Sequence, residues 1–87
     1  GLNDNEPIID SMKHYEYNIK QYLGATIEDW NYSFSSAGHS QREKVRSNMM
    51  TNIDELITEA KELRDFLQSI DYNHIDKELL MKLLKSK

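Results

Sequence analysis

The segment Ala37-Gly38-His39-Ser40-Gln41-Arg42 places a serine next to a histidine and two residues after a glycine. This spacing matches the start of the Gly-x-Ser-x-Gly turn that exposes the nucleophile of α/β-hydrolases. However, Arg42 stands where the turn needs its second glycine, and 87 residues cannot supply the large sheet of that fold. Ser40 and Glu43 instead have the Ser-x-x-Glu spacing of a helix capping box. We therefore predict that Ser40 caps a helix, and we assign no catalytic residue.

The three histidines provide only partial metal sites. Asp10 and His14 are four residues apart, so one helix face could present both, and Asp71 and His74 form a second close pair. Each pair offers two ligands, whereas a stable zinc site usually has three or four. The chain has no cysteine to complete such a site. We predict no metal site and no cofactor.

Three basic residues, Arg42, Lys44 and Arg46, open the second half of the chain. They stand at a predicted helix N-terminus, where the helix dipole disfavours positive charge. In an antiparallel hairpin they would lie near Glu28 and Asp29, which offers them ion-pair partners. The alternative function for this group is nucleic-acid binding by a small regulator, although the net charge of −4 argues against it.

Aromatic residues gather around the middle of the chain. Trp30 continues the apolar stripe of the first predicted helix, so we expect it in the core at the open end of a hairpin. Tyr32 and Phe34 follow in a predicted loop, and exposed loop aromatics next to arginine are typical of interface hot spots. The alternative is that Phe34 folds under the loop. The candidate partner-binding residues are Trp30, Tyr32, Phe34, His39, Arg42 and Arg46.

The elements that position these residues are all helical, because no run alternates with a period of two and apolar residues recur every three or four positions. We predict helices over about 7–30, 40–70 and 75–86, with a loop over 31–39. Pro7 suits the first position of a helix. The first helix is expected to continue through Gly24. Asp76 is expected to cap the third helix, with Ile75 and Leu80 spaced as a hydrophobic staple.

The two long helices each carry an apolar stripe. The stripe of the first comprises Ile8, Met12, Tyr15, Ile19, Tyr22 or Leu23, Thr26 and Trp30. The stripe of the second comprises Val45, Met49, Ile53, Leu56, Ala60, Leu63, Leu67 and Ile70, flanked by Met50, Ile57 and Phe66. Both have a mean step near 3.6 residues, which is typical of one face of an α-helix.

The lengths of these segments predict an all-α fold, an antiparallel helical hairpin with a short third helix that together form a three-helix bundle. We expect the third helix to fold back along the C-terminal half of the second. The N-terminal half, with Val45, Met49, Met50 and Ile53, would then be partly exposed. An exposed apolar stripe usually indicates a partner, and two-fold dimers are the commonest assemblies. We therefore predict a homodimer that closes a larger bundle through these four residues.

Composition limits the function classes. A chain of 87 residues forms one domain, and no apolar run approaches the roughly 18 residues of a membrane span. The absence of cysteine and of a signal peptide leads us to expect a cytoplasmic location. The carboxylates of the second long helix form a solvated face or bind a basic partner. We predict a non-catalytic protein–protein interaction domain, an inhibitor, adaptor or assembly subunit that binds through its helix faces and the aromatic region 30–42.

Overall fold

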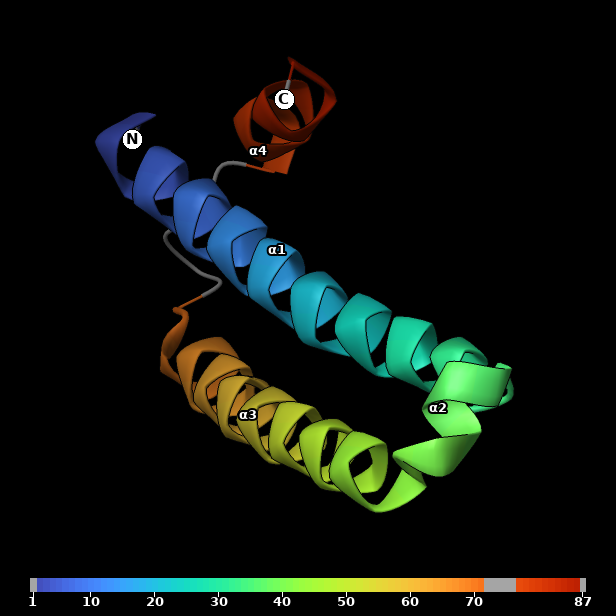
Figure 1. Ribbon diagram of the computed structural model, residues 1–87. Coiled ribbons are helices and arrows are strands. Elements are labelled where there is room, and N and C mark those ends of the chain that lie inside the picture. The colour runs from blue at the N-terminus through green and yellow to red at the C-terminus, as the bar shows by residue number, and fades with distance from the viewer. Residues whose placement is uncertain (1, 72–76, 87) are drawn as a thin grey trace.

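The computed structural model describes residues 2–71 and 77–86, and all its regular structure is helical (Figure 1). The helices are α1 (Leu2–Tyr32), α2 (Ser36–Ser40), α3 (Arg42–Ser69) and α4 (Lys77–Ser86). Helices α1 and α3 lie antiparallel, α2 forms the turn between them, and α4 lies against α1 at the opposite end (Figure 1). The all-α prediction and the hairpin are confirmed. The molecule is elongated, with extents of 56 × 25 × 13 Å.

Helix α1 starts earlier than the sequence indicates. It begins at Leu2, so Pro7 lies inside the helix rather than at its first position. Pro7 lacks the N–H that would bond to the carbonyl of residue 3, but this loss falls next to the first turn, where few intrahelical bonds are present. Further along, α1 runs unbroken through Gly24, as expected.

The turn between the long helices contains a helix where the sequence predicts only a loop. Ser35 caps α2, and its hydroxyl accepts a hydrogen bond from the backbone N–H of Gly38 at 3.0 Å. Ser40 is the last residue of α2, and its hydroxyl donates to the carbonyl of Ala37 at 2.7 Å. The N-cap of α3 is Gln41, which makes no side-chain capping bond. The predicted capping box of Ser40 and Glu43 is therefore wrong, because Ser40 belongs to the preceding helix.

Gly38 allows α2 to pack directly against the end of α1. It is buried, and a Cβ atom at this position would lie 2.6 Å from the carbonyl carbon of Tyr32 and still closer to the carbonyl oxygen. No glycine among the described residues has a positive φ angle. Close backbone approach, rather than an unusual turn conformation, therefore requires glycine here.

The side chains between α1 and α3 recur with alternating steps of four and three residues. We call them the inner positions. On α1 they are Ile8, Met12, Tyr15, Ile19, Tyr22, Thr26 and Asp29, and from Tyr15 onward each is less exposed than the residue that follows it. At the start of α1 the order is reversed, because Ile9 is only 1% exposed whereas Ile8 is half-buried. On α3 they are Val45, Met49, Asn52, Leu56, Glu59, Leu63 and Phe66. A mean step of 3.5 residues is the heptad spacing that keeps two long helices in continuous contact.

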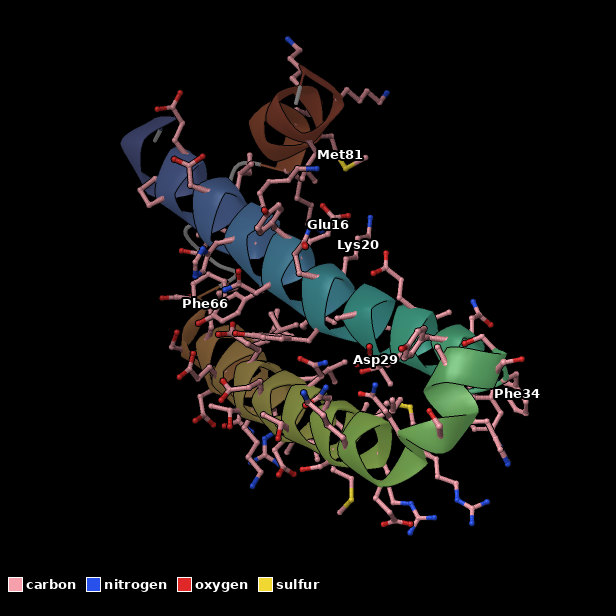
Figure 2. All side chains as sticks on the ribbon, viewed as in Figure 1. Glu16, Lys20, Asp29, Phe34, Phe66 and Met81 are labelled. Carbon is pink, nitrogen blue, oxygen red and sulfur yellow. The ribbon has the colours of Figure 1, made fainter. Side chains whose placement is uncertain are left out.

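The predicted stripes, with their mean step of 3.6 residues, differ from the inner positions at several residues. The sequence predicts Trp30 in the core, but Trp30 is 54% exposed and Asp29 takes the inner position, as Figure 2 shows. On α3, Ala60 and Leu67 are exposed, whereas Glu59 and Phe66 are partly buried. The physical reason is the heptad geometry: the 3.5-residue repeat determines which residues face the other helix, and some of those residues are polar.

Contacts between the rings of Tyr15 and Phe66, with centroids 5.8 Å apart, give the register of the hairpin. Because the helices are antiparallel, one heptad forward on α1 corresponds to one heptad back on α3. Tyr22 is therefore level with Glu59. The next heptad brings Asp29 level with Asn52.

Helix α4 packs against α1, not along α3 as predicted. Met12, Lys13 and Glu16 of α1 and Leu84 of α4 line a pocket where the two helices meet. Figure 1 shows α4 close to end-on, so it crosses α1 at a steep angle. The predicted cap at Asp76 and staple residue Ile75 lie outside the described residues, as does His74.

Candidate protein-binding face

One side of the hairpin carries a continuous series of apolar side chains that no helix covers in the described part of the chain. We call it the open face. Each member on a helix directly follows an inner position of that helix, and Phe34 lies in the turn just beyond α1, in contact with Trp30. The members are Leu23, Ile27, Trp30 and Phe34 on the α1 side and Met50, Ile53, Ile57 and Ala60 on α3. All except the half-buried Ile53 are exposed.

The helical geometry explains why residues from two helices share this face. One step along an α-helix turns by about 100° in a fixed sense. Because α1 and α3 run in opposite directions, a forward step from an inner position leads to the same side of the hairpin on both. Backward steps lead to the other side, which carries Glu28, Glu55, Glu62 and Asp65.

Two aromatic rings form the end of the open face nearest the turn. The ring centroids of Trp30 and Phe34 lie 5.0 Å apart, with an interplanar angle of 78°. This edge-to-face arrangement is one that aromatic pairs prefer. The Ser33 hydroxyl donates to the Trp30 carbonyl at 2.6 Å, and the Phe34 N–H donates to the Asn31 carbonyl at 3.2 Å. The exposed aromatic pair is thus held by a structured turn.

Phe34 does not fold under the turn. Its exposed fraction is 72%, the largest of the exposed large apolar side chains, and it projects at the turn end of the hairpin (Figure 2). The other candidate residues of this region, Tyr32, His39, Arg42 and Arg46, are exposed as well. Tyr32 lies two residues after Trp30, about 200° around α1, so it lies toward the opposite side from Trp30. The predicted aromatic site is therefore divided between two sides.

The four residues expected at a dimer interface occupy different environments. Val45 is only 5% exposed and Met49 is half-buried, so both belong to the seam between α1 and α3. Val45 is therefore unsuited to contact a second molecule. Met50 and Ile53 lie on the open face. The homodimer itself stays a prediction.

The basic residues at the start of α3 do not form one patch. Arg42 and Arg46 are four residues apart and share a side, whereas Lys44 lies about 200° around the helix from Arg42. Arg46 makes an ion pair of 3.9 Å with Glu43. Among the described residues, no ion pair joins the three to Glu28 or Asp29, so the predicted pairing across the hairpin is wrong.

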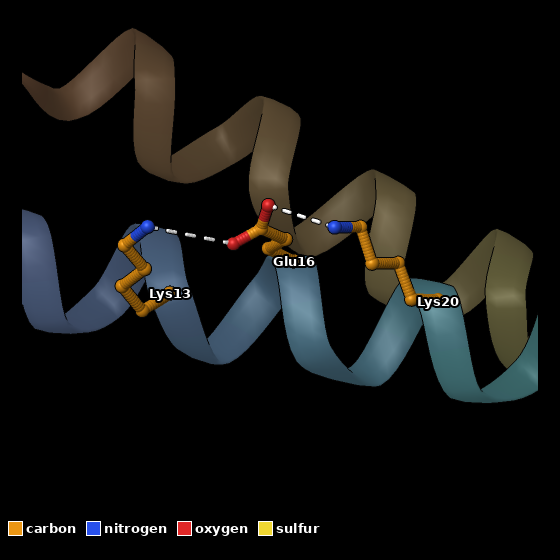
Figure 3. Close-up of polar contacts among 3 residues, drawn as sticks. All are labelled: Lys13, Glu16 and Lys20. Atoms are coloured by element: carbon orange, nitrogen blue, oxygen red, sulfur yellow. Dashed lines mark hydrogen bonds and ion pairs between the residues drawn. The ribbon is translucent and has the colours of Figure 1, made fainter. Parts of the chain in front are cut away.

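Three charged side chains, Lys13, Glu16 and Lys20, lie in a row along α1 (Figure 3). The Lys20 Nζ atom donates to Glu16 Oε2 at 3.1 Å, and Lys13 Nζ lies 3.7 Å from Glu16 Oε1. The hydrogen bond and charge of Lys20, followed by the charge of Lys13, lower the pKa of Glu16 below the ordinary value for a glutamate. Glu16 therefore stays ionised to a lower pH than a free side chain.

The remaining chemical candidates show no assembled site within the described residues. No group of three or more histidine, cysteine, aspartate or glutamate side chains could hold a metal there. His14 accepts a hydrogen bond from the Asn18 amide at 3.1 Å. In the same part of the chain, the helices lack the combination of length and apolar character that crossing a bilayer requires.

Comparisons with known proteins give no relative: no family model, no curated protein and no solved structure matches the chain.

The sequence interpretation names Leu23 only as an alternative stripe residue, places Ala60 in the apolar stripe of α3 and Ile57 at its flank, and misses Ile27, so it assigns none of the four to a surface site. A signal for them is present. Leu23, Ile27, Trp30 and Phe34 follow one another at steps of four, three and four, so α1 carries a second apolar stripe beside the first. Two adjacent stripes on one long helix indicate two packing surfaces.

Proposed function

We propose that this protein is a non-catalytic interaction domain that binds a partner protein through the open face of its hairpin. The observation that carries the proposal is the pairing of two apolar rows, one from each long helix, into one continuous exposed surface. Soluble proteins rarely expose large contiguous apolar surface without a binding role.

The arrangement of the face also suits binding. Trp30 and Phe34 provide large aromatic anchors, and hot spots of protein interfaces are enriched in tryptophan. Long packed helices supply a rigid support, so the anchors lose little conformational freedom on binding. Nucleic-acid binding through Arg42, Lys44 and Arg46 has less support, because these residues point to different sides of α3.

The test is an affinity capture with matched variants of the full chain, from the cells that produce it. The disrupting variant carries Phe34→Ser and Ile57→Ser, one change on each row. The control is Tyr17→Ser, because Tyr17 is 64% exposed and lies about 200° around α1 from inner Tyr15, away from the open face. Circular dichroism establishes that both variants are folded.

We expect the wild type and Tyr17→Ser to retain the same partner and the double variant to lose it. A partner retained equally by all three proteins would contradict the proposed surface. Retention by none of them would contradict the proposed function.

A further inference from the structure

Basic side chains bound the apolar stretch of the open face at both ends. Lys20 on α1, Arg64 on α3 and Arg46 on α3 each directly follow an inner position, as the apolar residues of the open face do. Lys20 and Arg64 lie at the end far from the turn, and Arg46 lies at the end near the turn. In the hairpin register, Lys20 and Arg64 lie within about one helical turn of each other. The apolar rows between these ends contain no carboxylate. The open face is therefore locally basic on a chain whose net charge is −4.

These basic groups are incompletely neutralised. Arg64 is exposed and makes no ion pair within the described residues. Arg46 meets Glu43 only at 3.9 Å, and their side chains are 65% and 79% exposed. Lys20 shares Glu16 with Lys13. A binding partner can therefore supply carboxylates to this rim.

The chain already shows an amphipathic helix on the neighbouring part of this side. Helix α4 contacts α1 where Met12, Lys13, Glu16 and Leu84 line their junction. Lys13 and Glu16 directly follow inner positions, as the open-face residues do, so α4 covers the beginning of the same α1 side. Its charged residues, Lys77, Glu78, Lys82 and Lys85, are mainly basic. The open face, which follows along the same side of α1, has a basic rim and therefore suits a helix with acidic residues.

Resting on the proposed function, we propose that the open face binds an amphipathic helix of a partner protein whose apolar stripe is flanked at both ends by acidic residues. The apolar row from Leu23 to Trp30 spans about 10 Å along α1 and Phe34 extends it into the turn, so the partner stripe covers at least about two turns. Its aliphatic or aromatic residues pack on the two rows. Its acidic ends pair with Lys20 and Arg64 on one side and with Arg46 on the other.

Two synthetic peptides test this inference on the full chain. They share the same helical stripe of leucines, and one carries glutamates and the other lysines at both ends. Trp30 is the single tryptophan of the chain and lies on the open face, so its fluorescence reports binding directly. We expect the acidic peptide to bind at least about ten-fold more tightly at low salt, although the net charge of the protein favours the lysine peptide. The preference should shrink as salt rises.

A matched pair of charge reversals locates the contact. Arg64→Glu should weaken binding of the acidic peptide about five-fold. Lys61→Glu makes the same charge change three residues earlier, two residues after inner Glu59 and therefore outside the open face. It should change the affinity less than about two-fold, because exposed charges outside an interface contribute little.

Equal or tighter binding of the lysine peptide would overturn the acidic partner and leave the proposed binding face standing. Binding of neither peptide would overturn both. If the protein dimerises with rising concentration and Ile57→Glu abolishes the dimer, a second copy of the chain occupies the open face. That result would also overturn the inference.

Discussion

Tyr15 and Phe66 face each other across the hairpin, with ring centroids 5.8 Å apart and an interplanar angle of 40°. The contact assigns Phe66, and not the neighbouring Leu67, to the seam between α1 and α3. Leu67 is 39% exposed and follows the inner position instead. The choice between these adjacent residues determines which side of α3 is core and which is surface.

Alanine substitution distinguishes the two residues. Phe66→Ala should lower the free energy of unfolding by about 2–4 kcal/mol, because it removes a partly buried ring and leaves a cavity. Leu67→Ala should cost less, about 1 kcal/mol, since Leu67 is already 39% exposed and makes no ring contact across the seam. Urea unfolding followed by circular dichroism measures both values. A larger loss for Leu67→Ala would contradict the 3.5-residue seam.

Glu59 provides a second test of the seam. Its Oε2 atom is shielded from solvent and has no hydrogen-bond partner among the described residues. Replacing such a group with an apolar one of similar size removes an unfavourable desolvation. Glu59→Leu should therefore raise the free energy of unfolding by roughly 1–2 kcal/mol.

The control for Glu59 is Glu62→Leu, which is exposed on the opposite side of the hairpin. It should change stability by less than about 0.5 kcal/mol. If both changes stabilise equally, general charge reduction, and not burial of Glu59, explains the effect.

The sequence is sufficient to predict the hairpin but not the rotation of its helices. Length, helical periodicity and the cluster of small residues before Arg42 predict two long antiparallel helices. The rotation depends on whether the repeat is 3.5 or 3.6 residues. A repeat of 3.6 selects Ile53 and Leu67, whereas a repeat of 3.5 selects their neighbours Asn52 and Phe66, and the sequence is compatible with both. Only the packed hairpin selects the heptad, since two long helices stay in contact only at that spacing.

The same ambiguity conceals the candidate site. The sequence pattern predicts Trp30 and Leu67 as core because they extend an apolar stripe, yet each directly follows an inner position. Periodicity does not predict helix α2, because its cap, Ser35, lies among serines that also suit a loop. Placement of α4 on α1 depends on tertiary contacts that helical periodicity does not contain.

Two glycine substitutions should have opposite effects on stability. Gly24 lies in the interior of α1, and a methyl group added there would have nothing within 4 Å, so Gly24→Ala should stabilise the protein by about 0.5–1 kcal/mol. Gly38→Ala should destabilise it by about 1–3 kcal/mol, because the added methyl group collides with the backbone at Tyr32. Thermal unfolding of both variants measures this difference. A stabilising Gly38→Ala would contradict the close contact between α2 and α1.

Glu16 gives a prediction for pH. Lys20 is the main cause of its lowered pKa, so Lys20→Met should raise that pKa toward the ordinary value, and Lys13→Met should raise it less. Because the folded-state pKa is depressed, the interaction contributes stability above the unfolded-state pKa and loses it as pH falls through the folded one. NMR titration of the Glu16 carboxyl carbon measures both shifts. A larger effect from Lys13→Met would contradict the observed hydrogen bond.

The most direct measurement of the binding face is NMR mapping of the full chain during titration with the acidic amphipathic peptide. The largest shifts should occur at the Trp30 indole N–H and at the methyl groups of Ile27 and Ile57, because these groups line the open face. Signals of Glu55 and Glu62 on the opposite side should remain nearly unchanged. Shifts concentrated at Glu55 and Glu62, with Trp30 unaffected, would contradict the assignment of the open face as the binding surface.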